Sequence, residues 1–245
     1  MSLSRIYIDA DLHIGSSVEL ATPTSHYIKN VLRLKTGQQI VLFNGKQAVD
    51  YIASVEIQGK RIYASPVSSS LKHLESPLHT NLIQAIGKSE HVDFIVQKAT
   101  ELGISQVYLF NSERTQTHIK STRLEKKLAH WQGIIISACE QCGRNILPTL
   151  CFKETLQACM DSVVHSNKIL LDFDGESIQQ LDHKFEAGLP FSMLIGPEGG
   201  LTADEIQQAK MANFNACTLG PRVLRMETAA ISVVSLVQYH YGDLN

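Results

Sequence analysis

The sequence lacks any uninterrupted apolar run of the roughly 20 residues that a membrane-spanning helix requires. Its first residues, 1–11, carry charges and do not contain the apolar stretch of a signal peptide. The apolar fraction of 44% and the charged fraction of 19% are ordinary for a soluble globular chain. We therefore expect a cytoplasmic protein without a membrane partner.

Cysteine is scarce and irregularly spaced. Five cysteines are an odd number, which argues against a disulfide framework. Cys139 and Cys142 form a C-x-x-C pair, but a zinc site of about four ligands would need a second such pair. No metal-ligand spacing links the histidines His26, His91, His118 and His130, so we expect ordinary surface or packing roles for them. We expect no metal, and cysteines that pack in or near a core.

Strong net charge is also missing. The formal net charge of −2 excludes a chain that is basic throughout. Residues 1–70 hold seven Lys/Arg and five Asp/Glu, a balance of +2, and the remaining 15 against 19 give −4. This bias is modest, but it fits an N-terminal module that contacts phosphates.

The first 70 residues read as a series of short strands. Apolar and β-branched residues recur at 5–8, 39–43, 49–57 and 61–64, with turn signals between them. One helical piece near 26–34 interrupts the series. Many short strands in so few residues predict a small β-barrel, followed by a linker over 65–80 that is rich in Ser, Pro and His.

The rest of the chain alternates strands with helices. This order predicts an α/β domain whose parallel sheet is covered by helices on both faces. The expected strands are 81–86, 104–110, 169–173, 191–195 and 216–219, and the expected helices are 91–102, 124–142, 203–213 and 226–240.

A glycine-rich loop follows the expected strand 191–195. The run 196–200 (GPEGG) lets the backbone approach a ligand closely, and Thr202 and Glu205 have the spacing of a capping box. The loop matches neither G-x-x-x-x-G-K-[ST] nor G-x-G-x-x-G, which disfavours a triphosphate or dinucleotide site. It could hold a different ligand at the carboxyl end of a strand, or be only a tight turn.

A second loop, 219–230, again leads from a strand into an apolar helix. It carries Arg222, Arg225 and Glu227 in a setting that is otherwise apolar. Charges in such a setting need partners or a function. The loop could therefore contain a structural ion pair, for example Arg225 with Glu227, or part of a site.

Together, the order and spacing of these two loops resemble those of the SPOUT methyltransferases, and in particular the ribosomal RNA small subunit methyltransferase E family. Further segments resemble the same family: 30–34 (NVLRL), 97–103 (QKATELG), 112–114 (SER) and 139–144 (CEQCGR). The resemblance covers most of the chain and is most specific in its last 55 residues.

The resemblance implies a PUA-like, RNA-binding β-barrel over residues 1–72 and a SPOUT methyltransferase domain with a trefoil knot over 73–245. It implies a homodimer that transfers a methyl group from S-adenosylmethionine (SAM) to N3 of a uridine, uridine 1498, in 16S rRNA of the small ribosomal subunit. The alternatives are a SPOUT enzyme that modifies another rRNA or tRNA position, and a non-catalytic RNA-binding protein.

The resemblance also leads us to expect particular site residues. We expect Arg225 to stabilise a uracil anion and Glu198 or Glu227 to accept its proton. The SAM-binding residues would be Leu171 (or Asp172), Ile195, Gly196, Pro197, Gly199, Gly200, Leu219, Gly220, Leu224, Arg225 and Thr228. The RNA-binding residues would be Arg5, Lys29, Arg33, Lys35, Arg114 and Arg144.

Overall fold

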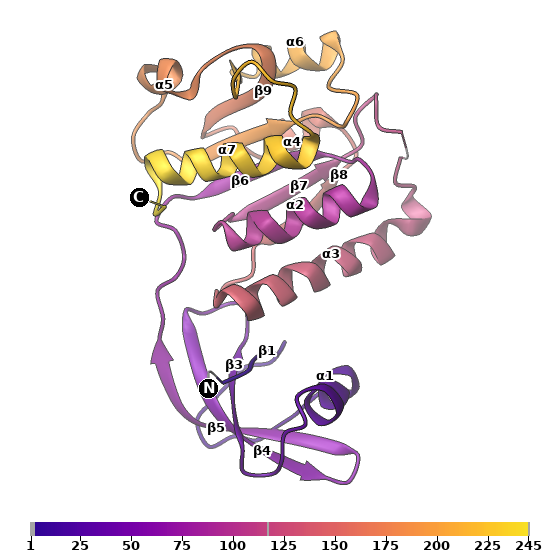
Figure 1. Cartoon of the computed structure of the whole chain (residues 1–245), viewed down its shortest axis with the longest axis vertical. Coiled ribbons are helices and arrows are strands. Elements are labelled where there is room, and N and C mark those ends of the chain that lie inside the picture. Colours follow the sequence, from indigo (N-terminus) through magenta and orange to yellow (C-terminus); the bar gives the residue numbers. More distant parts are fainter. Residues whose placement is uncertain (1–2, 117, 245) are drawn as a thin grey trace. The chain divides into compact units, whose positions relative to one another are not determined.

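The computed structural model describes residues 3–116 and 118–244. The chain divides into two compact units, each described separately below (Figure 1). Unit 1 comprises Met1–Glu75 and Cys139–Leu147, and unit 2 comprises Ser76–Ala138 and Pro148–Asn245. No helix within the described ranges is both long and apolar enough to cross a membrane.

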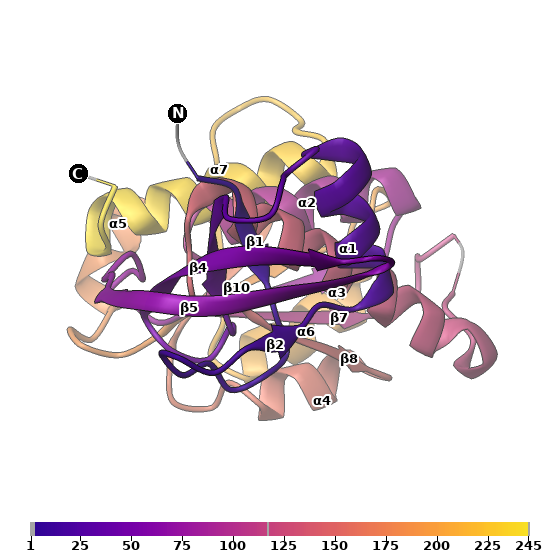
Figure 2. The same ribbon diagram turned by 90° about the horizontal axis from the view of Figure 1, so that it is seen from below.

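Unit 1 contains a five-stranded sheet in the order β1-β3-β4-β5-β2. Its core is apolar and includes Ile6, Ile28 and Leu42. Figure 2 shows β4 and β5 as a long pair of strands, and their pairing is antiparallel. The strands are β1 (Arg5–Tyr7), β2 (Val18–Glu19), β3 (Gln39–Phe43), β4 (Val49–Gln58) and β5 (Arg61–Leu71), and the helical pieces are α1 (Thr22–His26) and the π-helical η1 (Tyr27–Val31).

Two local predictions in unit 1 are corrected. Strand β5 continues to Leu71, into the segment expected to be a linker, and a shift in register near Ile52 accommodates Pro66, which has no backbone N–H for the ladder. The helix expected over 26–34 begins earlier, at Thr22, and its π-helical part ends at Val31. Arg33, with a φ of 53°, then departs from right-handed helical geometry.

Unit 2 is built on a six-stranded sheet in the order β11-β9-β10-β6-β7-β8. All its strand pairs are parallel, which confirms the predicted parallel sheet. Strand β8 was not predicted. The strands are β6 (Thr80–Ala85), β7 (Gln106–Phe110), β8 (Thr149–Lys153), β9 (Asn167–Glu176), β10 (Phe191–Ile195) and β11 (Asn215–Cys217).

Helices cover both faces of this sheet. Alternate strand residues such as Ile83 and Phe110 share a core with residues of α4 and α6. Helices α2 and α7 pack together, and Figure 1 shows them side by side across the sheet. The helices of unit 2 are α2 (Ser89–Glu101), α4 (Leu156–Asp161), α5 (Ile178–Leu181), the 3₁₀ turn η2 (Asp182–Lys184), α6 (Ala203–Met211) and α7 (Met226–Tyr241); α3 (Ser121–Cys142) begins in unit 2 and its last residues belong to unit 1.

Candidate active site

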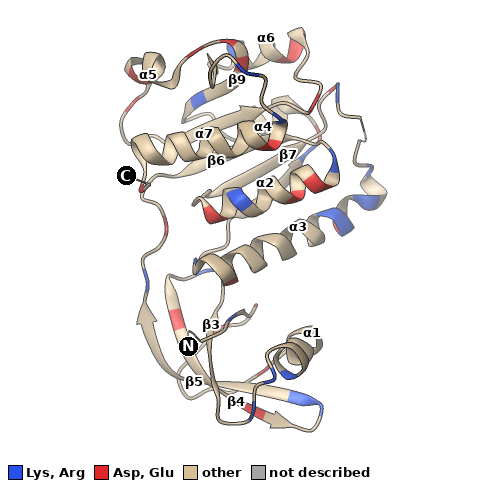
Figure 3. Ribbon diagram, in the orientation of Figure 1, with Lys and Arg blue, Asp and Glu red and all other residues tan. Residues whose placement is uncertain are grey.

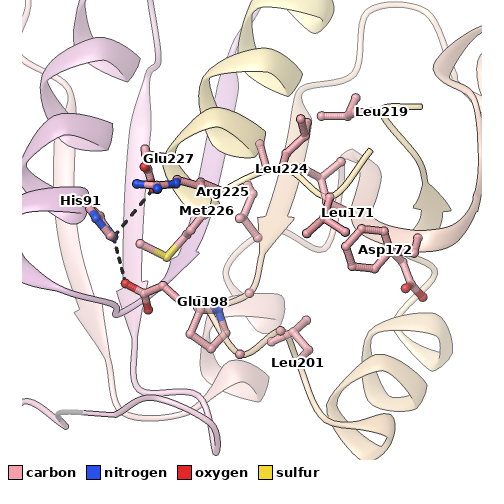
Figure 4. A pocket seen from close by; sticks show the side chains of 18 of the residues that line it. His91, Leu171, Asp172, Glu198, Leu201, Leu219, Leu224, Arg225, Met226 and Glu227 are labelled. Atoms are coloured by element: carbon pink, nitrogen blue, oxygen red, sulfur yellow. Dashed lines mark hydrogen bonds and ion pairs between the residues drawn. The ribbon is translucent and has the colours of Figure 1, made fainter. Parts of the chain in front are cut away.

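A pocket of about 780 Å³ lies in unit 2 where β10 and β11 end, beside the middle of β9 (Figure 4). Parallel sheets bind ligands at the carboxyl ends of their strands, and a volume of this size suits a small organic molecule. Both glycine-containing loops line the pocket, so the structure brings together segments that were singled out separately in the sequence. Apolar side chains form much of its wall, among them Leu171, Ile195, Leu201, Leu219 and Leu224.

The first loop follows β10, all of whose residues are buried. At Gly196 a Cβ atom would lie 3.0 Å from the backbone N of Leu201, so a side chain there would force the backbone of the turn to shift. Gly200 has a φ of 71°, in the left-handed region that favours glycine. The predicted capping box is present: Thr202 and Glu205 each accept a backbone N–H of the other at the start of α6.

A segment after β7 fastens this loop. Buried Glu205 accepts hydrogen bonds from Ser112 Oγ and from the Glu113 backbone N–H, both at 3.1 Å. Arg114 donates from Nη1 to the carbonyl oxygens of Gly199 and Leu201, at 3.1 and 3.3 Å. The S-E-R segment therefore holds the glycine loop in place.

The second loop is more exposed than the first. Gly220 has a φ of 98°, and Val223 is 82% exposed. The loop ends at Arg225, the exposed N-cap residue of α7. It forms part of the pocket lining through residues 219, 220 and 222–225.

Glu198, in the glycine loop, is held by several donors. Its Oε1 accepts the Lys88 backbone N–H at 2.9 Å and lies 3.0 Å from His91 Nδ1. Burial alone would raise the pKa of Glu198, but backbone N–H groups of Lys88 and Glu198 and the imidazole together lower it below its ordinary value. This carboxylate is therefore a weak proton acceptor.

Glu227, in the first turn of α7, has a different environment. Its Oε2 is buried and accepts no hydrogen bond from the described residues. That oxygen lies 3.7 Å from His91 Nδ1, within ion-pair distance but too far for a hydrogen bond. Figure 4 shows His91 facing both Glu198 and Glu227. The sequence interpretation had given His91 only a packing or surface role.

Nearly all the expected SAM-binding residues line this pocket, including Leu171, Gly196 and Leu224, and Asp172 lies there too. Thr228 is the exception, because it is exposed on α7 and Ala229 lines the pocket instead. Successive residues of a helix point about 100° apart, so one position decides which side chain faces the site.

The expected RNA-binding residues fall into different settings. Arg5 pairs with Asp50 at 2.6 Å and lies over the Phe43 ring, and buried Arg144 pairs with Glu75. These two arginines are therefore engaged in ion pairs inside unit 1, and their expected role at RNA stays a prediction.

Exposed residues remain available in the same unit: Lys29, Arg33 and Lys35. Lys29 Nζ donates to the carbonyl of Gly59 in the turn between β4 and β5, so the segment after α1 lies beside that turn. Figure 3 shows Lys and Arg of unit 1 around α1 and at this turn.

The cysteines are all free, and Cys139, Cys159 and Cys217 are buried. The Cys139–Cys142 side-chain hydrogen bond and burial raise the pKa of Cys139, so its thiol stays protonated near neutral pH. Across residues 3–116 and 118–244, no group of three His, Cys, Asp or Glu side chains could hold a metal ion.

Comparison with known proteins identifies relatives along the whole chain. The RNA methyltransferase domain family matches residues 74–238, and the RNA methyltransferase PUA domain matches residues 20–65. A ribosomal RNA small subunit methyltransferase E of Buchnera aphidicola is 35% identical over 245 residues, covering 99% of this chain and 98% of the relative.

Solved structures agree with these matches. A methyltransferase of Legionella pneumophila in complex with its bound cofactor SAM has a TM-score of 0.93 at 34% identity, with 100% of each chain covered. The ribosomal RNA small subunit methyltransferase E of Neisseria gonorrhoeae, bound to S-adenosyl methionine, has a TM-score of 0.90 at 33% identity, again with 100% of both chains covered. The chain therefore belongs to the ribosomal RNA small subunit methyltransferase E family.

Proposed function

We propose that this chain transfers a methyl group from SAM to N3 of a uridine in 16S rRNA of the small ribosomal subunit, uridine 1498 in the family. The observation that carries the proposal is the strand-end pocket enclosed by the two predicted loops, in a chain of this family. The SAM named with the Legionella and Neisseria structures supports the identity of the donor.

The residues of the pocket fit SAM. Leucine and isoleucine side chains offer apolar surface for an adenine ring. At Gly200 and Gly220 a Cβ would meet nothing within 4 Å, so at these positions the two loops leave their backbones open. We propose that residues 195–200 and 219–225 hold the donor, together with Leu171.

When bound, SAM would supply a methyl group already activated by its sulfonium. The chain must then position the uracil, exclude water and accept the N3 proton. Glu227 is the better acceptor, because its Oε2 accepts no hydrogen bond from the described residues, whereas donors lower the pKa of Glu198. Arg225, exposed beside Glu227, would stabilise the uracil anion that forms when this proton leaves.

Several features of the whole protein are part of the same proposal. Residues 1–72 would form a PUA-like barrel that binds rRNA, with Lys29, Arg33 and Lys35 contacting phosphates. Residues 73–245 would form the SPOUT domain with a C-terminal trefoil knot. The active protein would be a cytoplasmic homodimer.

The test is mass spectrometry of 16S rRNA from cells that lack the gene and from the same cells complemented with it. We expect one N3-methyluridine to be absent without the gene and restored by the wild-type chain. Restoration should fail with Glu227→Gln, which lacks the proposed proton acceptor. An N3-methyluridine level that does not depend on the gene would overturn the proposal. Loss of a different modification, or of one in tRNA, would reassign the substrate within the SPOUT enzymes.

A further inference from the structure

His91 connects three elements that surround the proposed donor site. It lies in the first turn of α2, and its Nδ1 faces Glu198 of the glycine loop at 3.0 Å and Glu227 of α7 at 3.7 Å. These partners are 107 and 136 residues away in the sequence. The imidazole is 21% exposed, so these contacts are partly shielded from solvent.

A neutral imidazole cannot satisfy both carboxylates. Both carboxylates face Nδ1, and only Glu198 is at hydrogen-bond distance from it, so a neutral ring offers Glu227 neither a hydrogen bond nor a charge. Glu227 Oε2 would then remain buried without a compensating partner, which is costly for an ionised carboxylate. An imidazolium instead places a positive charge between the two glutamates.

Other charged groups face the same region as His91. On α2, Glu90 Oε1 lies 4.0 Å from His91 Nε2, but Glu90 is 79% exposed and therefore well solvated. Lys88 precedes α2 and Arg225 precedes α7; both line the pocket. The N-terminus of α7 also favours a negative Glu227. Among the described residues, His91 is the one side chain in an ion pair with Glu227.

We propose that His91 is a positioning residue: in its cationic form it links Glu198 to Glu227 and so fixes the glycine loop against the start of α7. This inference rests on the proposed function, since these two elements would hold SAM. Only the protonated imidazole carries this positive charge, so the link, and donor binding with it, weakens when the ring loses its proton.

The test compares wild type, His91→Gln and His91→Arg by calorimetric titration with SAM between pH 6 and 8.5. At pH 6 we expect His91→Gln to bind SAM about tenfold more weakly than wild type, because it keeps a donor but loses the charge. That ratio should decrease as the pH rises. His91→Arg, whose guanidinium stays charged, should retain affinity at both pH values. Titration of SAM itself affects all three proteins equally and cancels in the ratios.

His130→Gln is the matched control. His130 also pairs with a carboxylate, Asp93 at 2.9 Å, but does not line the pocket. Its loss should leave the SAM affinity unchanged at every pH.

Melting curves of the same proteins without SAM test the link separately. His91→Gln should lower the melting temperature more at pH 6 than at pH 8.5. If that difference is absent, or if the SAM affinity ratio is the same at all pH values, the inference is wrong. If wild type fails to bind SAM at any pH, the proposed function is wrong, and the ligand-free melting curves alone then decide whether the link exists.

Discussion

Arg114 donates a hydrogen bond from Nη1 to the carbonyl oxygen of Gly199 at 3.1 Å, across 85 residues of sequence. The same Nη1 reaches the carbonyl of Leu201 at 3.3 Å. One side chain thus spans the turn that ends the glycine loop. The contact is exposed at Gly199, so we expect it to order the loop more than to stabilise the whole fold.

Replacing Arg114 should therefore weaken SAM binding. We expect Arg114→Ala to raise the dissociation constant about tenfold, since two hydrogen bonds from a charged donor are lost and the loop gains freedom before binding. Isothermal titration calorimetry measures this directly. Arg123→Ala is the control, because Arg123 is also an exposed arginine but lies in α3, and this variant should bind SAM like wild type. Equal affinities for both variants would show that Arg114 does not support the loop.

Gly196 is predicted to tolerate a side chain poorly. A Cβ there would lie 3.0 Å from Leu201 N and 3.2 Å from Gly200 C, and these backbone atoms can move only if the loop is distorted. Gly196→Ala should therefore cost about 1–3 kcal/mol in the free energy of unfolding. Urea denaturation measures the change.

Gly133, unlike Gly196, has room for a side chain. It lies in α3, and a Cβ there would meet nothing within 4 Å. Gly133→Ala should stabilise the protein by about 0.5–1 kcal/mol, because alanine is the better helix former. If the two alanine variants changed stability in the same direction, crowding at Gly196 would not be the cause.

Glu205 is expected to be important for stability. It is 4% exposed and accepts hydrogen bonds from Ser112 Oγ and from the backbone N–H groups of Glu113 and Thr202. Glu205→Ala would leave these donors without their acceptor, and we expect a loss of about 3 kcal/mol. In a protein of this size that loss corresponds to a decrease in melting temperature of about 6–12 °C.

The neighbouring Asp204→Ala is the matched variant, since Asp204 is also in the first turn of α6 but is exposed. It should lose only the helix-terminus effect, about 0.3–1 kcal/mol. Differential scanning calorimetry of the two variants separates the buried network from simple charge at the helix start. Similar losses would contradict the role given to Glu205.

Glu198 should make stability depend on acid pH. Its pKa is lowered in the folded state, below the ordinary value of 4.5, so the folded protein binds fewer protons than the unfolded chain around that pH. The stabilising contribution is present above about pH 4.5 and is lost as the pH falls through the lower, folded-state pKa. Wild type should therefore lose more stability on acidification than Glu198→Gln.

Urea denaturation at a series of pH values from 3 to 7 tests this difference. The variant should have a lower free energy of unfolding than wild type at pH 7, and this difference in free energy should become smaller towards pH 3. If the difference in free energy stayed constant, the carboxylate charge of Glu198 would contribute nothing to the stability of the fold.

Local sequence signals were sufficient to predict both loops that line the pocket. Three glycines in the run 196–200 and the capping box at Thr202 predicted the turn and the start of α6, because these signals act over a few residues. The alternation of strands and helices likewise predicted the parallel sheet. Strand β8 and helix α4 were missed. Strand β8 is an edge strand that is only partly buried, so it lacks the continuous apolar run of β10, and the six residues of α4 carry little periodicity.

The charged residues were harder to interpret. Arg144 resembles a surface arginine in the sequence, and its burial depends on Glu75, 69 residues away. His91 has no neighbouring motif that marks it, and its partners come from the glycine loop and α7. Only the tertiary fold brings such pairs together, so patterns within a short window could not reveal them.

The most direct test of the whole account is methyl transfer by the purified protein. Small ribosomal subunits from cells lacking the gene would be incubated with the protein and SAM that carries an isotopic label in its methyl group, and the digested 16S rRNA would be analysed by mass spectrometry. We predict a single labelled N3-methyluridine with wild type and none with Glu227→Gln. Label at another atom or nucleotide, or no transfer by wild type that binds SAM, would contradict the account.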